Sequence, residues 1–322
     1  MSKAKTSSQG LEYVTLEDAL SMLQYSDLAN AFSSMAEKPW AGRVLKRVTT
    51  ATYTLIDVQR DIDDFFIDKI VELLDGTKSR EARSYLNSMT SLSELVNVVV
   101  VLHNVSIGRK PVVIFPTPLA RKIPLVKPEE FDIDAFRRSV DKVFAGLVDR
   151  FVESKELSMR EIALTLHKSV ANIDKVSNYR VWRIVGIYHD AIAVRLCRMF
   201  PELSREPLYP LIMEDNIFRE ACSADLTELA KTSSGYRKIV LELFDALADS
   251  STILKGVEAF DLATVLTTMS LSKTLAGGDV EERVRRLVRL MGSSVILKLI
   301  VLSIYTDTYK VELQRLLSKW LK

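Results

Sequence analysis

The chain has 322 residues, of which 48% are hydrophobic and 27% are charged. This near-average composition excludes disorder on compositional grounds, and the length allows two or three domains. Lys and Arg (44) almost balance Asp and Glu (42), so no concentrated basic face for nucleic acid is indicated. Eleven glycines and nine prolines are about half the usual share, which predicts few turns and long helices.

The first ten residues are small and polar, and they lack the apolar core of a signal peptide. We predict a flexible tail over 1–10. Thr15 and Asp18 match a capping box, which predicts that a helix begins at Leu16. The most apolar stretch, 295–304, is about half the length that spans a membrane and contains Lys298. Any membrane association is therefore expected to be peripheral.

Apolar residues at three- and four-residue steps predict an amphipathic helix in the first quarter of the chain. The stripe consists of Leu55, Val58, Ile62, Phe66, Ile70 and Leu73. The β-branched run 98–102 lies in a longer apolar stretch without turn signals, so we predict helix there too. The short run 111–116 is bracketed by prolines, which predicts an extended linker.

The same helical period continues near the C-terminus. Gly277 and Gly278 predict a break, and Asp279 is expected to cap the helix that follows. A closing helix is predicted over 292–321, with Thr306 as the one polar residue on its apolar stripe.

A faint repeat divides the chain into three. The apolar segments 92–107 and 185–201 are each followed by two charged residues and a proline, Arg109-Lys110-Pro111 and Arg205-Glu206-Pro207, and 295–321 is a third apolar segment at a similar interval. The pattern of 15–32 has an echo at 222–236. We therefore predict an all-α fold of three similar helical-bundle units in a pseudo-threefold arrangement. After the tail 1–10, the units cover 11–113, 114–210 and 211–322.

This arrangement resembles a central-stalk family of archaeal and vacuolar-type rotary ATPases (ATP synthases), the C subunit of the archaeal enzymes and the d subunit of the eukaryotic ones. The stretch Thr15-Leu16-Glu17-Asp18-Ala19-Leu20-Ser21-Met22-Leu23, followed by Tyr25-Ser26-Asp27, is similar to a recurring motif of that family. A later copy runs from Leu211 through 225–229 to 232–236, and 185–190 resembles the junction between units. The segment 292–321 is similar to the closing helix. The family's arginine-bearing first helix has no counterpart in 1–10.

The resemblance implies a non-catalytic central-stalk subunit. Such a protein links the rotor shaft to the proteolipid ring and transmits torque for proton-coupled ATP synthesis or hydrolysis. Its partners would be the rotor shaft subunits and the membrane proteolipid ring, with membrane contact only through these proteins. It would lie peripherally on the cytoplasmic side of the cell membrane. The resemblance implies no nucleotide, cofactor or metal, and no catalytic, cofactor-binding or metal residue.

Two alternatives remain open. One is a helical scaffold or adaptor protein. The other is a helical isoprenoid-type Mg²⁺-dependent enzyme, since clustered carboxylates on a helix can hold Mg²⁺. Its candidates are Asp61, Asp63, Asp64 and Asp68. Because Asp57, Asp61, Asp64 and Asp68 recur at helical steps opposite the apolar stripe, a solvated polar face also explains them.

The other chemical candidates carry little signal. His103, His167 and His189 have no metal-type partner at helical spacing, and His103 is expected to be a core residue. Cys197 and Cys222 have neither metal nor disulfide spacing. No phosphate-binding Gly-rich motif or nucleophile motif occurs. Arg283, Arg285, Arg286 and Arg289 lie beside Glu281 and Glu282, as on a mixed-charge surface helix or a partner-facing basic patch.

Overall fold

The computed structural model describes residues 12–50, 52–173, 177–223 and 238–321. The protein is 72% helix, and the described ranges contain 14 α-helices and no strand. This confirms the predicted all-α fold. The expected pseudo-threefold repeat is not supported. The described helices give no evidence of three repeated units.

The helices of the first third of the chain follow one another with short connections. They are α2 (Leu16–Met22), α3 (Leu28–Ser33), α4 (Ala41–Val48), α5 (Leu55–Asp75) and α6 (Arg80–Ser106). The predicted capping box is present at α2, where Thr15 Oγ1 accepts from Asp18 N at 3.1 Å and Asp18 Oδ2 accepts from Thr15 N at 3.0 Å. The run 98–102 is helical, within α6, as predicted.

The middle third begins with two 3₁₀ turns, η1 (Ala120–Lys122) and η2 (Pro128–Glu130). It continues with α7 (Ile133–Ser139), α8 (Lys142–Ser154), α9 (Met159–Val170), α10 (Tyr179–Met199) and η3 (Pro201–Arg205). The run 111–116 is neither helix nor strand, as predicted for a linker. The buried side chain of Asn97 satisfies its backbone, because its Oδ1 accepts from Ile114 N at 2.9 Å and Phe115 N at 3.1 Å.

The last third holds α11 (Asp215–Ser223), α13 (Lys238–Ser250), α14 (Val257–Ser272), α15 (Asp279–Thr306) and α16 (Lys310–Trp320). Two predictions are wrong here. The N-cap of α15 is Gly278, and Asp279 lies inside the helix, where it pairs with Arg283 at 2.9 Å. The predicted helix 292–321 is broken, because Asp307 and Tyr309 have left-handed backbones (φ 51° and 59°) between α15 and α16.

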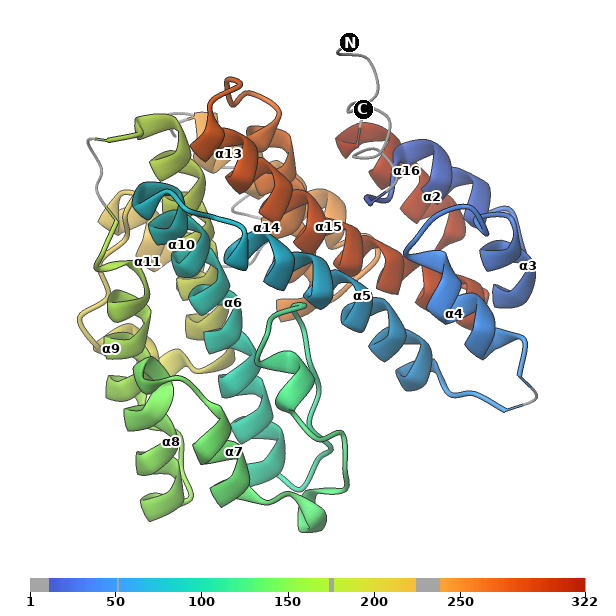
Figure 1. Ribbon diagram of the computed structural model, residues 1–322. Coiled ribbons are helices and arrows are strands. Elements are labelled where there is room, and N and C mark those ends of the chain that lie inside the picture. The colour runs from blue at the N-terminus through green and yellow to red at the C-terminus, as the bar shows by residue number, and fades with distance from the viewer. Residues whose placement is uncertain (1–11, 51, 174–176, 224–237, 322) are drawn as a thin grey trace.

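Four of the longer helices form a closed bundle at the centre of the molecule. In it α6 packs on α10, α10 on α14, α14 on α15, and α15 on α6 (Figure 1). α5 lies along α15, α13 along α14, and α9 along α6. The bundle thus combines helices from 11–113, 114–210 and 211–322, and their apolar side chains share one core.

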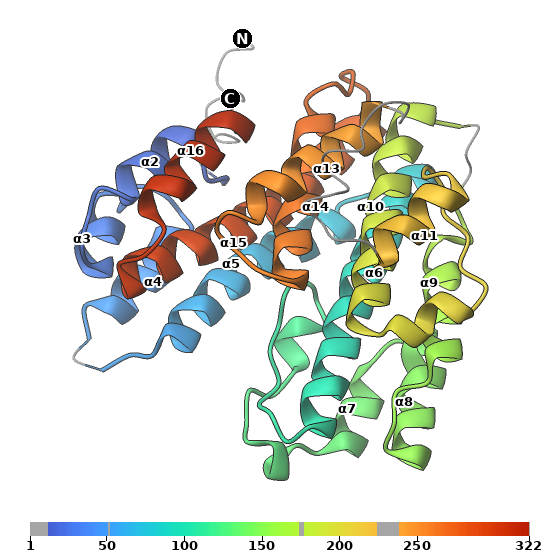
Figure 2. The same cartoon turned by 180° about the vertical axis from the view of Figure 1, so that it is seen from behind.

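The beginning and the end of the described chain lie together. α2 packs beside α16, with α3 and α4 nearby, at the end of the α5–α15 pair (Figure 2). Val14 N donates to Ser293 Oγ at 3.1 Å, and Lys310 Nζ donates to Tyr25 O at 3.2 Å. The helices of 11–113 therefore pack directly on those of 211–322.

Among the described residues, two helices are long and apolar enough to cross a membrane, α6 and α15. Their apolar windows are 89% and 78% buried inside the protein. Core helices of this kind meet the same criterion as membrane spans, so their composition says nothing about a membrane.

Candidate interaction surfaces

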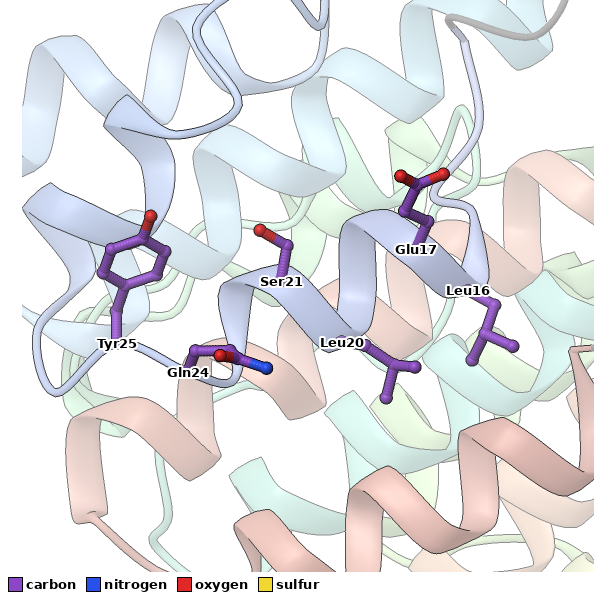
Figure 3. A pocket seen from close by; sticks show the side chains of 6 residues that line it. All are labelled: Leu16, Glu17, Leu20, Ser21, Gln24 and Tyr25. Carbon is purple, nitrogen blue, oxygen red and sulfur yellow. The ribbon is translucent and has the colours of Figure 1, made fainter.

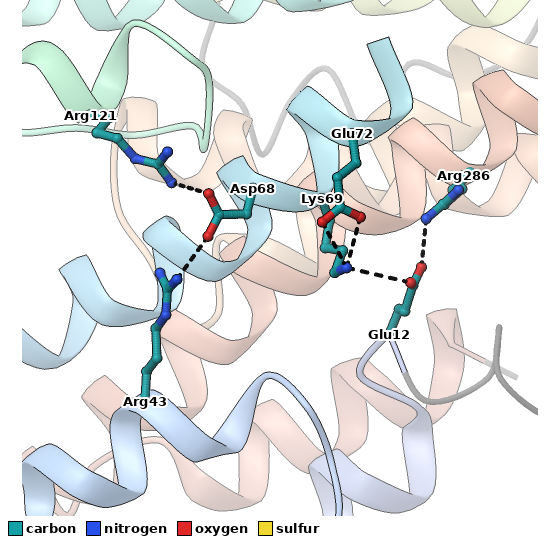
Figure 4. Close-up of polar contacts among 7 residues, drawn as sticks. All are labelled: Glu12, Arg43, Asp68, Lys69, Glu72, Arg121 and Arg286. Carbon is teal, nitrogen blue, oxygen red and sulfur yellow. Dashed lines mark hydrogen bonds and ion pairs between the residues drawn. The ribbon is translucent and has the colours of Figure 1, made fainter. Parts of the chain in front are cut away.

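The acidic row of α5 faces basic side chains from other elements. Asp68 accepts from both Arg43 and Arg121 at 2.8 Å (Figure 4). Asp64 lies 3.5 Å from Arg121. Arg121 belongs to η1 and Arg43 to α4, so these carboxylates connect three segments. Since such pairs are partly exposed, each contributes modestly to stability.

Asp61 is also engaged. Arg47 on α4 clamps it through two guanidinium nitrogens, one of them 3.1 Å from Oδ1. Asp57 instead completes the capping box of Thr54 at the start of α5. Asp61, Asp64 and Asp68 thus lie on the predicted polar face, where they are half-buried and paired with arginines and not fully solvated. Within the part of the chain that the structure describes, no cluster of three or more His, Cys, Asp or Glu residues could hold a metal ion.

A buried ion pair behind this row is absent from the sequence prediction. Lys298 of α15 lies 2.9 Å from Asp63 Oδ1, and its Nζ also donates to Ile114 O at 2.9 Å. Ser294 Oγ donates to Asp63 at 2.7 Å. Burial raises the pKa of Asp63, and Lys298 and Ser294 oppose that rise. The lone lysine in the most apolar stretch was the available signal, because a buried ammonium needs a carboxylate partner.

A cavity of about 130 Å³ opens beside this pair, between α5, α15 and the segment 110–125. Asp63 and Lys298 form part of its wall, and Arg60, Lys110 and Arg121 are its other basic residues. Its remaining lining is largely apolar, and the apolar residues are Ile56, Ile67, Pro111, Val112, Val113, Ala120, Ile123 and Leu125. We refer to this cavity as the α5–α15 pocket.

A second concave surface follows α2. It has a volume of about 630 Å³ and opens widely to solvent. Two rows of side chains line it, Leu16, Leu20 and Gln24 on one side and Glu17, Ser21 and Tyr25 on the other (Figure 3). The stretch that carries the family resemblance thus places Leu16, Leu20 and Tyr25 here, and buries Ala19, Met22 and Leu23 in the core.

The stretch 185–190 ties α10 to the segment that follows Pro210. The Asp190 carboxylate accepts from the backbone N–H groups of Leu211, Ile212 and Met213 at 2.7, 2.7 and 2.8 Å. Gly186 permits this close approach, because a Cβ there would lie 2.7 Å from Ile212 Cγ1. The later copy of the resembling motif, at 225–229 and 232–236, lies outside the described residues.

Two histidines that are far apart in sequence meet in space. The rings of His167 and His189 are 6.4 Å apart, and His167 Nε2 hydrogen-bonds with Pro207 O at 2.8 Å. His189 is buried, with Nδ1 2.9 Å from Asp190. Helical spacing could not reveal this pair, since the two residues lie on α9 and α10.

The prediction of a core His103 is wrong: the ring is half-buried and packs edge-to-face on Phe200 at 5.2 Å.

The arginines at the start of α15 bind within the protein. Arg286 pairs with Glu12 at 2.9 Å, and Arg289 lies 5.8 Å from the Tyr13 ring centroid. Arg285 donates to the carbonyls that end α14, and Arg283 contacts Gly76 and Thr77 after α5. Figure 4 shows Glu12 between Arg286 and Lys69. Most of this basic cluster is therefore a set of internal links.

The two cysteines lie close together in space, although their spacing in the sequence matched neither a metal site nor a disulfide framework. Cys197 of α10 and Cys222 of α11 line one pocket of about 520 Å³ with Arg198 and Arg219. Both are free thiols. The Cys197 thiol lowers the pKa of Cys222, and the two arginines lower it further.

A comparison of the chain with protein-family models and with curated proteins finds no match.

Proposed function

We propose that the chain is a non-catalytic subunit that holds other proteins together, specifically the central-stalk subunit that links rotor shaft and proteolipid ring in an archaeal or vacuolar-type rotary ATPase. The supporting observation is the solvent-facing surface of α2. The motif behind the family resemblance divides between the core and this concave surface, and five of its residues line the surface that is open to a partner.

The contacts of 185–190 add support. Residues 185–190 resemble the junction between units in that family. In this protein, Asp190 binds the backbone of 211–213, and Gly186 lets that segment approach α10 closely. The three-unit arrangement belongs to the same proposal. α6, α10 and α15 come from the three predicted units and share one bundle, so such units would have to pack through a common core.

The ion pairs of α5 weigh against the isoprenoid-type enzyme. A diphosphate enzyme uses its clustered carboxylates as Mg²⁺ ligands, whereas Asp61, Asp64 and Asp68 form ion pairs with Arg47, Arg121 and Arg43, respectively. Mg²⁺ would have to displace these guanidinium groups, and Arg47 holds Asp61 through two nitrogens.

Membrane fractionation with a tagged chain in its native host tests the proposal. We expect the chain to sediment with membranes, to be released by high salt without detergent, and to co-purify with a proteolipid ring and shaft subunits before release. Screening to about 3 Å at 1 M salt weakens such polar contacts. A chain that never sediments, or that requires detergent, contradicts the stalk role. Co-purification with soluble proteins only would support the scaffold alternative.

Variants of α2 sharpen this test. Leu16→Asp with Leu20→Asp should reduce recovery with the membrane complex several-fold, because it places charge on the proposed contact surface. Leu164→Asp is the matched control, since Leu164 is 39% exposed on α9. Equal losses in both variants would contradict a contact through α2.

Calorimetry with MgATP is a second test. We expect no specific heat of binding, because the sequence has no phosphate-cradling loop and the proposed role is mechanical. A micromolar site would count against the stalk role.

A further inference from the structure

The size of the α5–α15 pocket limits what can occupy it. Its volume of about 130 Å³ is well below the roughly 300–1,000 Å³ of ordinary small-molecule sites. It is close to the roughly 150 Å³ of an apolar cavity that holds one benzene ring. The pocket therefore has room for a single apolar side chain.

The surroundings of the pocket continue the apolar surface outward. Ile56 and Val112 line it and are 49% and 42% exposed. A partner that inserted one side chain would also cover these two residues. A buried anchor surrounded by apolar contacts that exclude water is the usual anatomy of a binding hot spot.

The charges around the pocket favour a partner segment of negative charge. Lys298 is neutralised by Asp63, and Arg121 by Asp64 and Asp68. Arg60 and Lys110 are exposed and form no ion pair with any described residue, although Arg60 lies near enough to Asp57 to lower its pKa. Two unpaired positive charges thus remain beside the pocket, and complementary charge steers association.

We propose that the α5–α15 pocket receives one apolar side chain from an acidic segment of a partner protein, with Arg60 and Lys110 facing the carboxylates of that segment. This inference rests on the proposed role as a subunit that holds other proteins, and it adds the site and the chemistry of the contact.

Methyl NMR on the full chain tests the proposal with synthetic peptides. The probe is acetyl-Glu-Glu-Leu-Glu-Glu-amide, and two comparison peptides replace its Leu by Ala or its four Glu by Lys. We expect saturable shifts of the methyl groups of Ile56, Val112, Val113 and Ile123 with the probe. Both comparison peptides should bind at least about tenfold more weakly, which corresponds to about 1.4 kcal/mol.

Charge and shape variants complete the test. Arg60→Glu with Lys110→Glu should weaken the probe and strengthen the lysine peptide, and Val112→Asp should weaken both. Arg138→Glu with Lys142→Glu is the matched control, because both residues are exposed and neither lines the pocket. Equal binding of the acidic and basic peptides, or unchanged binding in the pocket variants, would overturn the proposal.

The outcome is separable from that of the proposed function. A chain that binds the probe but never sediments with membranes retains the docking site and loses the stalk role. A chain that sediments with the complex but shows no shifts at these methyl groups retains the stalk role and loses the docking site.

Discussion

At the scale of single residues, burial changes the ionisation of polar side chains in this protein. Glu94 is the clearest case, because it lies inside the apolar helix α6 and accepts from Leu119 N at 3.1 Å. Burial raises its pKa from 4.5 to about 7, and the Leu119 N–H opposes the rise. Glu94 is therefore expected to titrate close to neutral pH.

We expect the variant Glu94→Gln to be more stable than the wild type above pH 7. A carboxyl whose folded pKa exceeds its unfolded pKa stabilises the fold fully below pH 4.5, and this contribution is lost as the pH rises through about 7. The free energy of unfolding of Glu94→Gln relative to that of the wild type should therefore rise by up to about 3 kcal/mol as the pH increases from below 4.5 to above 7. Urea titrations at several pH values measure it, with the exposed Glu153→Gln as control. A difference that does not depend on pH would contradict the assignment.

Cys222 should react faster than Cys197 with iodoacetamide. Cys222 is half-buried, its pKa is lowered first by the Cys197 thiol and then by Arg198 and Arg219, and Cys197 is buried with a raised pKa. The thiolate is the nucleophile, so the order of pKa values sets the order of rates. Peptide mass spectrometry over time gives both rates. Cys197→Ala should slow Cys222 several-fold, and faster labelling of Cys197 in the wild type would refute the order.

At the scale of elements, polar contacts join the helices of the central bundle. Arg195 of α10 and Asp261 of α14 form a bidentate pair, with Nη2 3.0 Å from Oδ2. Their side chains are only 2% and 7% exposed. Ser93 of α6 and Tyr188 of α10 share another buried hydrogen bond of 2.7 Å. These contacts specify which faces of the helices meet.

A double-mutant cycle tests the buried pair. We expect Arg195→Met and Asp261→Leu each to destabilise the protein by about 3–5 kcal/mol, because each leaves an unpaired buried charge. The double variant should cost much less than the sum, since both charges are gone. Urea unfolding measures all four proteins. Additive losses would show that the two side chains do not stabilise each other.

At the scale of the whole molecule, one core connects distant parts of the chain. The bundle of α6, α10, α14 and α15 has helices from all three predicted units, and α2 packs on α16. Asn178 Nδ2 donates to Glu281 at 2.8 Å, which adds a link between the second and third units. Separate folding units would instead have cores of their own.

We therefore expect the three tryptophans to report one unfolding transition. Trp40, Trp182 and Trp320 lie in 11–113, 114–210 and 211–322, respectively, and all are buried. Three variants that each retain one of them, with Phe at the other two positions, allow fluorescence and circular dichroism to be compared in urea. The two midpoints should coincide within each variant. A tryptophan whose fluorescence changes well before the circular dichroism would reveal an independent unit.

Local sequence signals predicted the helical class and several local features correctly. Scarce glycine and proline predicted long helices, the period of 55–73 predicted the buried face of α5, and the Thr15–Asp18 capping box predicted the start of α2. The linker 111–116 followed from its prolines. The period, the capping box and the prolines depend on interactions within one or two helix turns, so the local sequence is sufficient to predict them.

Which helix faces meet and which charges pair depends on the three-dimensional packing of the chain. A helical period shows that one face is buried but not against which helix, so the α6–α10–α14–α15 bundle and the cavity beside α5 could not be predicted. Asp63 and Lys298, like His167 and His189, come together across helices distant in sequence. The left-handed residues Asp307 and Tyr309 interrupt an apolar stripe that locally favours one continuous helix. The bundle and these pairs depend on long-range packing, because each partner is supplied by a different part of the chain.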